Sequence, residues 1–367
     1  YMIELYGNPG TLYKLGRSAK EAVDLARAQV ASLLGANPEH IIFTSGGSEA
    51  NSLVFGGLVN YLQKTGKTHI LVSEIEHDSV LEASSELIKH GFCVDKIPVT
   101  HEGIVSPETV SALLRPDTGL IPVMLMNNES GARQPVWQIA GLCKQHGILL
   151  HTDCVQAAGC YRLRVEELGC DFASISSHKI HGPKGMGALY ARDKSLLTPL
   201  IHGGSDQEFG LRGGTENVPG IVGFGKACAI EASEIGENAI EISKLRNLFY
   251  TQLMMQLKKQ GLDGCVHVNG PFDAAWEYTP GKTLNLRIDG VDGETLLLML
   301  DSEGVCVSAG SACRSHEAEP SRVLTAMGLS KEEARSSIRV SFSRMNTPDE
   351  MFDAAVIFAD CIASLKG

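Results

Sequence analysis

Residues 171–185 read DFASISSHKIHGPKG, an apolar run that ends in a cluster of polar and basic side chains. The run from Asp171 to Ser176 predicts a strand, and Lys179 follows soon after its end. A lysine at a strand end in an α/β protein is partly buried, which suits it to form a Schiff base with a carbonyl group. Lys184 competes for this role, but it lies between a proline and a glycine in a predicted exposed turn.

Two earlier strand ends also carry polar residues. Residues 147–153, GILLHTD, predict a strand that ends at Asp153, with Gln156 three residues later. Residues 44–49, TSGGSE, follow a strand-like run and precede a helical pattern, and the amides at a helix start favour a phosphate. The alternatives are a helix-capping aspartate and an ordinary turn. Because parallel strands present their carboxyl ends at one edge of a sheet, a carboxylate there could pair with a cationic ring nitrogen.

The order of the predicted elements indicates the fold class. Predicted strands near residues 41–43, 70–72, 120–126, 148–151 and 172–176 are mostly separated by helical patterns, the first of which ends at Gly35. This alternation predicts a large α/β domain over residues 1–235 with a mostly parallel, mixed sheet. Residues 236–367 predict a smaller α+β domain, with a helix over 239–259, strands near 283–288, 305–308 and 338–342, and a last helix toward Leu365.

The three polar clusters together resemble the fold-type I pyridoxal-phosphate enzymes, in the branch of class V aminotransferases. The resemblance implies that Lys179 forms the Schiff base with pyridoxal 5'-phosphate and that Asp153 pairs with the pyridinium nitrogen. It implies further cofactor contacts by Gly47, Ser48, His77, Asn128, Gln156, Ser176 and His178. His77 matches the histidine that stacks on the ring and could take or give a proton, and Asn128 matches a residue near the ring oxygen and the substrate.

Residues 308–315, SAGSACRS, closely resemble the active-site loop of group I cysteine desulfurases, the NifS- and IscS-like enzymes. The small neighbours of Cys313 offer little apolar surface to bury it and suit a mobile loop. The resemblance implies conversion of L-cysteine to L-alanine, with the sulfur transferred to Cys313 as a persulfide for an acceptor protein. A selenocysteine lyase or an aminotransferase on the same fold remains the alternative, and a cofactor-free persulfide carrier is a rival of another class.

Two further segments extend the resemblance. Residues 212–215, RGGT, resemble a segment whose threonine, here Thr215, reaches the cofactor phosphate of the partner subunit, which implies a homodimer. Arg339 matches the arginine that clamps the substrate carboxylate through two parallel hydrogen bonds, although a surface ion pair is the alternative. The resemblance starts near Gly7. The family's Ala-Thr-Thr segment before that point has no counterpart, so we expect that it was removed or is not represented.

Composition excludes several classes of function. The 367 residues are 43% hydrophobic and carry a net charge of -11, which argues against direct binding of nucleic acid. No apolar run approaches the ~20 residues that span a membrane, and Tyr1–Tyr6 lack signal-peptide features, so we expect a cytoplasmic enzyme.

The ten cysteines form no metal motif, so no metal is expected. We expect Cys93, Cys143, Cys170, Cys228 and Cys361 to be buried. The acceptor stays open among iron–sulfur cluster assembly, tRNA thiolation and DNA sulfur modification.

Overall fold

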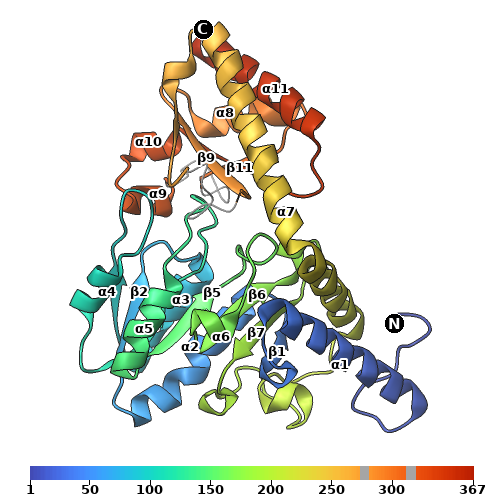
Figure 1. Ribbon diagram of the computed structural model, residues 1–367. Helices are drawn as coiled ribbons and strands as arrows, with labels where there is room; N and C mark the ends of the chain where they lie inside the picture. Colours follow the sequence, from blue (N-terminus) through green and yellow to red (C-terminus); the bar gives the residue numbers. More distant parts are fainter. Residues whose placement is uncertain (273–280, 311–319) are drawn as a thin grey trace. The chain divides into compact units, whose positions relative to one another are not determined.

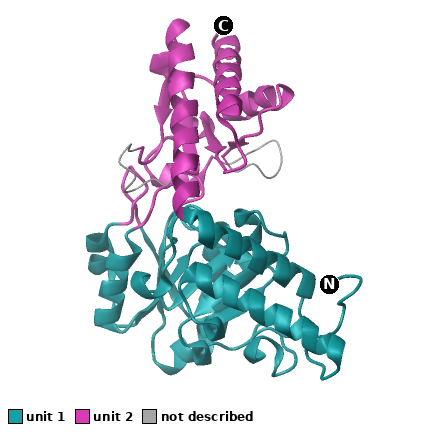
Figure 2. Cartoon of the chain, turned by 45° about the vertical axis from the view of Figure 1, so that its right-hand side comes forward, with its two compact units in different colours: residues 1–97, 106–126, 135–235 teal, residues 98–105, 127–134, 236–367 magenta. Residues whose placement is uncertain are grey.

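The computed structural model describes residues 1–272, 281–310 and 320–367. The chain divides into two units, drawn in different colours in Figure 2. Unit 1 comprises residues 1–97, 106–126 and 135–235, and unit 2 comprises residues 98–105, 127–134 and 236–367. Two short segments from the first half of the chain therefore belong to unit 2, which a single boundary along the sequence does not anticipate.

Unit 1 is built on a seven-stranded sheet with the strand order β1-β7-β6-β5-β4-β2-β3 (Figure 1). Its strands are β1 (Ile41–Thr44), β2 (His69–Ser73), β3 (Cys93–Ile97), β4 (Thr118–Pro122), β5 (Leu149–Asp153), β6 (Phe172–Ser176) and β7 (Gly187–Ala191). Strand β7 pairs antiparallel with β1 and β6, and the pairings among β2, β3, β4, β5 and β6 are parallel. The predicted mostly parallel, mixed sheet is confirmed.

Helices accompany this sheet, and four of its inner strands are buried along their whole length. Every residue of β2, β4, β6 and β7 is buried, as expected of a sheet covered on both faces. The α-helices that lie wholly in unit 1 are α1 (Lys14–Leu34), α2 (Gly47–Lys64), α3 (Asp78–Glu86), α4 (Pro107–Leu113), α5 (Val136–His146) and α6 (Val165–Leu168). In α1, Ala19, Val23, Ala26 and Val30 recur at helical spacing and are buried.

Strand β4 is shorter than the sequence predicted. It ends at Pro122, whereas the apolar run continues to Met126. Beyond Pro122 the amide of Met124 donates to the side-chain carboxylate of Glu76 at 2.7 Å, so this amide does not continue the ladder toward β2. On the other side, backbone amides beyond Pro122 still donate to β5, so a buried acidic side chain replaces only the pairing toward β2, and hydrophobicity alone does not reveal this.

Unit 2 is built on a four-stranded antiparallel sheet with the order β10-β11-β9-β8. Its elements are β8 (Val266–Val268), β9 (Thr283–Ile288), α8 (Gly293–Ser302), β10 (Ser308–Ala309), α9 (Arg322–Ala326), α10 (Lys331–Arg335), β11 (Ser337–Ser341) and α11 (Pro348–Lys366). The predicted strand near 305–308 is wrong in its bounds, because only Ser308 and Ala309 pair with β11.

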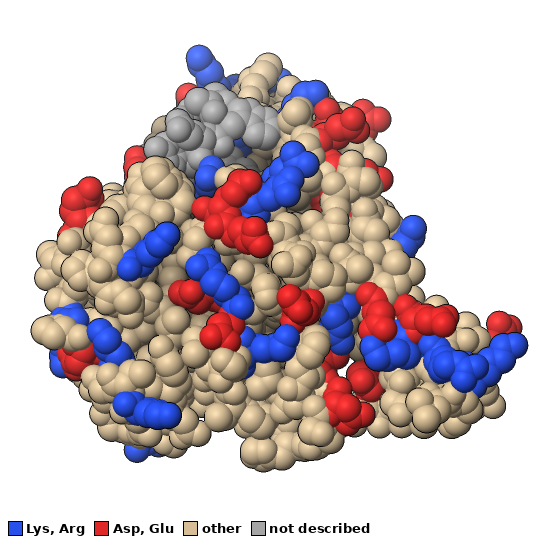
Figure 3. All heavy atoms as spheres, turned by 60° about the horizontal axis from the view of Figure 1, so that its bottom comes forward, with Lys and Arg blue, Asp and Glu red and all other residues tan. Residues whose placement is uncertain are grey.

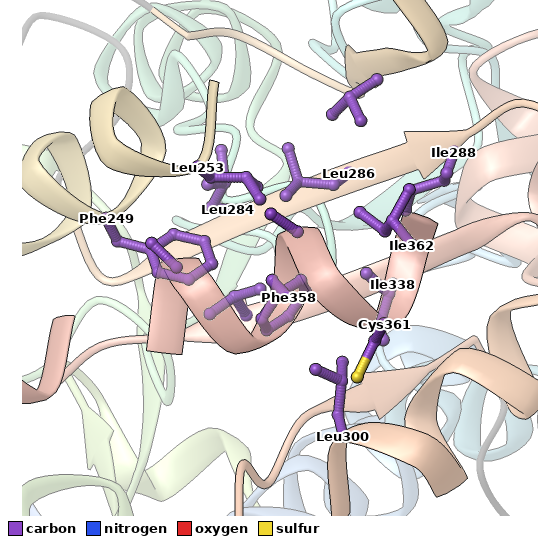
Figure 4. Packing of buried hydrophobic residues seen from close by; sticks show 14 of the residues in the cluster. Phe249, Leu253, Leu284, Leu286, Ile288, Leu300, Ile338, Phe358, Cys361 and Ile362 are labelled. Atoms are coloured by element: carbon purple, nitrogen blue, oxygen red, sulfur yellow. The ribbon is translucent and has the colours of Figure 1, made fainter. Parts of the chain in front are cut away.

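The core of unit 2 lies against one face of this sheet (Figure 4). Leu284, Leu286 and Ile288 alternate along β9 and are buried, as the two-residue period of a strand requires. The ring of Phe358 from α11 packs edge-on against Phe249, with 5.1 Å between ring centroids. The α+β architecture predicted for this part of the chain is therefore supported by a continuous apolar cluster.

Helix α7 (Val218–Lys259) is longer than predicted, because it begins well before Ala239. The boundary between the two units, at Ile235 and Gly236, falls inside this helix. Residues 218–235 include Gly220, Gly223 and Gly225, which lower the helix propensity of the segment, so the sequence does not indicate a helix there.

The cysteine predictions hold except at one position. Cys143, Cys170, Cys228 and Cys361 are buried, and burial raises the pKa of Cys143 to about 12. The prediction for Cys93 is wrong, because this residue is exposed. It begins β3, one of the two edge strands of the sheet, and its sulfur lies 3.1 Å from Nη1 of Arg115. No helix of the described residues is long and apolar enough to cross a membrane.

Candidate active site

The predicted phosphate loop lies between β1 and α2. Helix α2 begins at Gly47, directly after this loop, and the amides of its first turn have no partner within the helix. A side chain on Gly47 would place Cβ only 2.8 Å from Cγ2 of Val155, so glycine permits close approach to the end of β5. Ser48 is exposed in the first turn of α2. The loop therefore presents backbone donors and a hydroxyl, which suit an anion.

An ion pair ties this loop to the segment that carries Thr215. The carboxylate of Glu49 accepts hydrogen bonds from the amide of Ser45 at 2.8 Å and from Nε of Arg212 at 3.0 Å. Burial acts to raise the pKa of Glu49, but these hydrogen bonds outweigh it and lower the pKa. Thr215 itself is exposed three residues after Arg212.

Asp153 is a buried carboxylate at the carboxyl end of β5, and only 4% of it is exposed. Its oxygens accept hydrogen bonds from Nδ2 of Asn51 and from the amide of Val155, each at 2.9 Å. Burial raises the pKa of Asp153, while the two hydrogen bonds and the charges of His77 and Lys179 act in the opposite direction. A cationic group beside this carboxylate would stabilise its charged form.

The lysine cluster follows β6 in a short 3₁₀ helix over Ser177–Ile180. Lys179 is half-buried, whereas Lys184 is exposed. The hydroxyl of Ser176 lies 3.0 Å from Nδ1 of His178. Gln156 is half-buried just beyond β5. Unit 1 thus gathers the described candidates at strand ends: the loop after β1, Asp153 and Gln156 after β5, and the Ser176–Lys179 cluster after β6.

His77 lies at the start of α3, where its ring nitrogen Nδ1 accepts a hydrogen bond from the amide of Ser79 at 3.1 Å. The hydroxyl of Ser79 is also 2.8 Å from Nδ1. Nδ2 of Asn51 donates to this hydroxyl at 2.9 Å and to Asp153. The four side chains His77, Ser79, Asn51 and Asp153 therefore form one continuous network.

The structure places Asn128 and Arg339 in unit 2. The guanidinium of Arg339, on β11, donates to the carbonyl oxygen of Asn128 and to the hydroxyl of Ser308, each at 3.1 Å. These bonds hold the guanidinium in a fixed orientation. Oδ1 of Asn128 is buried and has no hydrogen-bond partner among the described residues. Cys313 lies outside the described residues.

Sequence reasoning missed three residues of these arrangements: Glu49, Asn51 and Ser79. Asn51 had a detectable signal, because it occupies the same helical face as the buried Val54, Phe55 and Leu58. A polar residue on a buried face needs a partner. Glu49 and Ser79 occupy partly exposed positions, where polar residues are usual, so no such signal marks them.

The chain is similar to a known protein family, to curated relatives and to solved structures. Residues 1–352 match the model of the family described as aminotransferase class-V. A cysteine desulfurase IscS of Methanosarcina thermophila is 40% identical over 367 residues, which cover 100% of this chain and 87% of that protein. A solved structure of a NifS-like protein has a TM-score of 0.87 at 35% identity and covers 100% of this chain and 93% of that one. The crystal structure of DndA from Streptomyces lividans has a TM-score of 0.77 at 37% identity, covering 93% of each chain.

Proposed function

The chain belongs to the class V aminotransferase family and to its cysteine desulfurases, and on this premise we propose that it converts L-cysteine to L-alanine and transfers the sulfur to Cys313. The observation that carries the proposal is the buried carboxylate of Asp153, which is held by two donors at a strand end and lies within electrostatic reach of Lys179. The IscS relative is named a cysteine desulfurase, and the NifS-like structure has the same fold at a TM-score of 0.87.

The residues of unit 1 fit pyridoxal 5'-phosphate. Asp153 is a buried carboxylate with a raised pKa, and a protonated ring nitrogen would supply the cation that stabilises its charge. Around it, Gly47, Ser48, Ser176 and His178 would hold the phosphate, Lys179 would bond to the aldehyde carbon, and Gln156 would contact the ring oxygen. When bound, this cofactor supplies an electron-withdrawing ring that takes up the electrons released at Cα.

The remaining chemistry is assigned to side chains of the chain itself. Nζ of Lys179, as a free amine, would remove the Cα proton of the substrate. Arg339 would bind the substrate carboxylate, and its bonds to Asn128 and Ser308 orient the guanidinium for that task. The thiolate of Cys313 would attack the substrate sulfur, so that an S–S bond forms as the C–S bond breaks. Cys313 is left as a persulfide.

The proposal extends to the assembly and to the sulfur acceptor. We propose a homodimer, because residues 212–215 resemble a segment that completes the partner's phosphate site. We also propose that the enzyme is cytoplasmic. A sulfur-acceptor protein would take the persulfide sulfur. One face of the molecule carries Lys and Arg side chains interspersed with Asp and Glu (Figure 3), which offers no continuous basic surface there for nucleic acid.

The test is to incubate the pyridoxal-phosphate-loaded protein with L-cysteine, to assay alanine and to weigh the peptide that contains Cys313. Alanine together with a peptide heavier by one sulfur atom is expected. Cys313→Ser should abolish alanine release, because a serine hydroxyl is a far weaker nucleophile than a thiol near neutral pH. The matched control is Cys306→Ser, which removes an exposed thiol of the same unit. Undiminished alanine from Cys313→Ser would favour the selenocysteine lyase alternative.

A further inference from the structure

The amide of Ser79 fixes the role of one ring nitrogen of His77. This amide N–H lies 3.1 Å from Nδ1 of His77, the side chain that caps the start of α3. A backbone N–H can only donate, so Nδ1 must be the acceptor. In a neutral imidazole one nitrogen accepts and the other carries the hydrogen. The hydrogen of neutral His77 therefore resides on Nε2.

Asn51 directs a second donor at the same nitrogen. Its carboxamide nitrogen Nδ2 lies 2.9 Å from a carboxylate oxygen of Asp153, and a charged carboxylate only accepts, so this atom must be the nitrogen and not the oxygen. The same Nδ2 donates to the hydroxyl oxygen of Ser79 at 2.9 Å. The hydroxyl hydrogen of Ser79 is then directed to Nδ1 of His77, 2.8 Å away.

Burial restricts the side chains of Asn51 and Asp153 in this hydrogen-bond network. Asn51 is 1% exposed, and Asp153 is held additionally by the amide of Val155. The carboxylate of Asp153 therefore sets the orientation of Asn51, which in turn sets the hydroxyl of Ser79. The order of the donors runs in one direction, from Asn51 to both Asp153 and Ser79, and from Ser79 to His77.

We propose that Asn51 and Ser79 are positioning residues that hold neutral His77 as its Nε2–H tautomer. With Nδ1 occupied by two donors, the ring offers a hydrogen-bond donor at Nε2 and has no lone pair there to act as a base. The meaning for catalysis rests on the proposed function, because His77 would then donate a hydrogen bond to the reacting groups and leave proton removal to Lys179. The tautomer itself is a property of the folded chain.

The test is the ¹⁵N NMR spectrum of histidine-labelled protein, recorded with and without pyridoxal phosphate. The expected pattern for His77 is a pyridine-type nitrogen at Nδ1 and a pyrrole-type nitrogen at Nε2, with the resonances assigned by their loss in His77→Gln. His101 is an internal reference of opposite sense, because its Nδ1 lies 2.7 Å from the carbonyl oxygen of Met327 and must carry the hydrogen. A pyrrole-type Nδ1 at His77 would overturn the proposal.

The role of the hydroxyl is tested by Ser79→Ala, with Ser79→Thr as the matched control. Alanine removes one of the two donors to Nδ1, so the ratio of the Nδ1–H to the Nε2–H tautomer should rise about fivefold, as expected for loss of one hydrogen bond. Threonine keeps the hydroxyl and should keep the wild-type ratio. Asn51→Asp should resemble Ser79→Ala, because a carboxylate would draw the Ser79 hydroxyl toward itself. An unchanged ratio in Ser79→Ala would overturn the proposal, whether or not the protein releases alanine from cysteine.

Discussion

Nε of Arg212 lies 3.0 Å from the carboxylate of Glu49, whose other oxygen accepts the amide hydrogen of Ser45. One acidic side chain thus joins the phosphate loop of this chain to the segment that presents Thr215. In the proposed dimer, the loop would serve the chain's own cofactor and Thr215 that of the partner, so the two phosphate sites would share this support.

Replacement of Glu49 by glutamine should weaken both the loop and the fold. Glutamine has one acceptor oxygen where the carboxylate uses two, so either Ser45 or Arg212 loses its partner. We expect a loss of about 1–3 kcal/mol in the free energy of unfolding and several-fold weaker retention of pyridoxal phosphate. Chemical denaturation and cofactor titration measure the two effects. The control is Glu241→Gln, which breaks an exposed pair with Lys244 on α7 and should change neither.

The stabilisation by Glu49 should depend on pH in a defined direction. Its pKa in the folded protein is lowered from the ordinary value of 4.5, because the hydrogen bonds and the charge of Arg212 outweigh burial. The contribution is therefore complete above about pH 4.5 and is lost as the pH falls through the lower folded value. The stability difference between wild type and Glu49→Gln should shrink below pH 4.5. A difference that grows on acidification would contradict this assignment.

Lys179→Ala should abolish covalent attachment of pyridoxal phosphate. Borohydride reduction of the wild-type protein, followed by peptide mapping, should place the label on Lys179, which is half-buried and whose charge acts to lower the pKa of Asp153. Lys184→Ala is the matched control, because this lysine is exposed only five residues away, and it should label normally. A label on Lys184 in the wild-type protein would show that the site is wrongly assigned.

Asp153→Asn should bind cofactor and yet turn over L-cysteine at least ~100-fold more slowly, in the range by which single electrostatic groups act in catalysis. A neutral amide cannot stabilise a protonated ring nitrogen. The absorbance of the bound cofactor and the rate of alanine formation, measured on one sample, separate binding from chemistry. Asp171→Asn is the control, since Asp171 is another carboxylate of unit 1 whose pKa is raised by burial. Equal slowing in both variants would argue for a general structural effect.

Arg339→Lys should raise KM for L-cysteine at least ~10-fold with a smaller change in kcat. Lysine provides a point charge and cannot make two parallel bonds to a carboxylate. It would also lose one of the contacts to Asn128 and Ser308 that orient the guanidinium. Arg335→Lys alters an exposed arginine at the end of α10 and should leave KM unchanged. Wild-type KM in Arg339→Lys would exclude Arg339 from carboxylate binding.

The sequence predicted which residues lie at the ends of β5 and β6, but it did not predict the hydrogen-bond partners of the side chains. Asp153 and Lys179 follow apolar runs that must be buried strands, so their placement at the carboxyl ends of β5 and β6 follows from local pattern. The hydrogen bond that the amide of Met124 makes beyond the end of β4 was not predictable in this way, because its acceptor is Glu76, a residue 46 positions before Pro122. The role of Ser79 was likewise not predictable, because it depends on hydrogen bonds of its hydroxyl with Asn51 and His77 in the folded chain.

The division of the chain into units bears on the order in which the enzyme can be assembled as it is synthesised. Residues 127–134 belong to unit 2, and the carbonyl of Asn128 meets Arg339, which is 211 residues later in the chain. At roughly 5–20 residues per second, the ribosome needs about 10–40 s to make that stretch. During this interval unit 1 can begin to fold, whereas the Asn128 segment waits for its partner strand. A nascent chain stalled before Arg339 would therefore have the lysine cluster but would lack the proposed binding site for the substrate carboxylate.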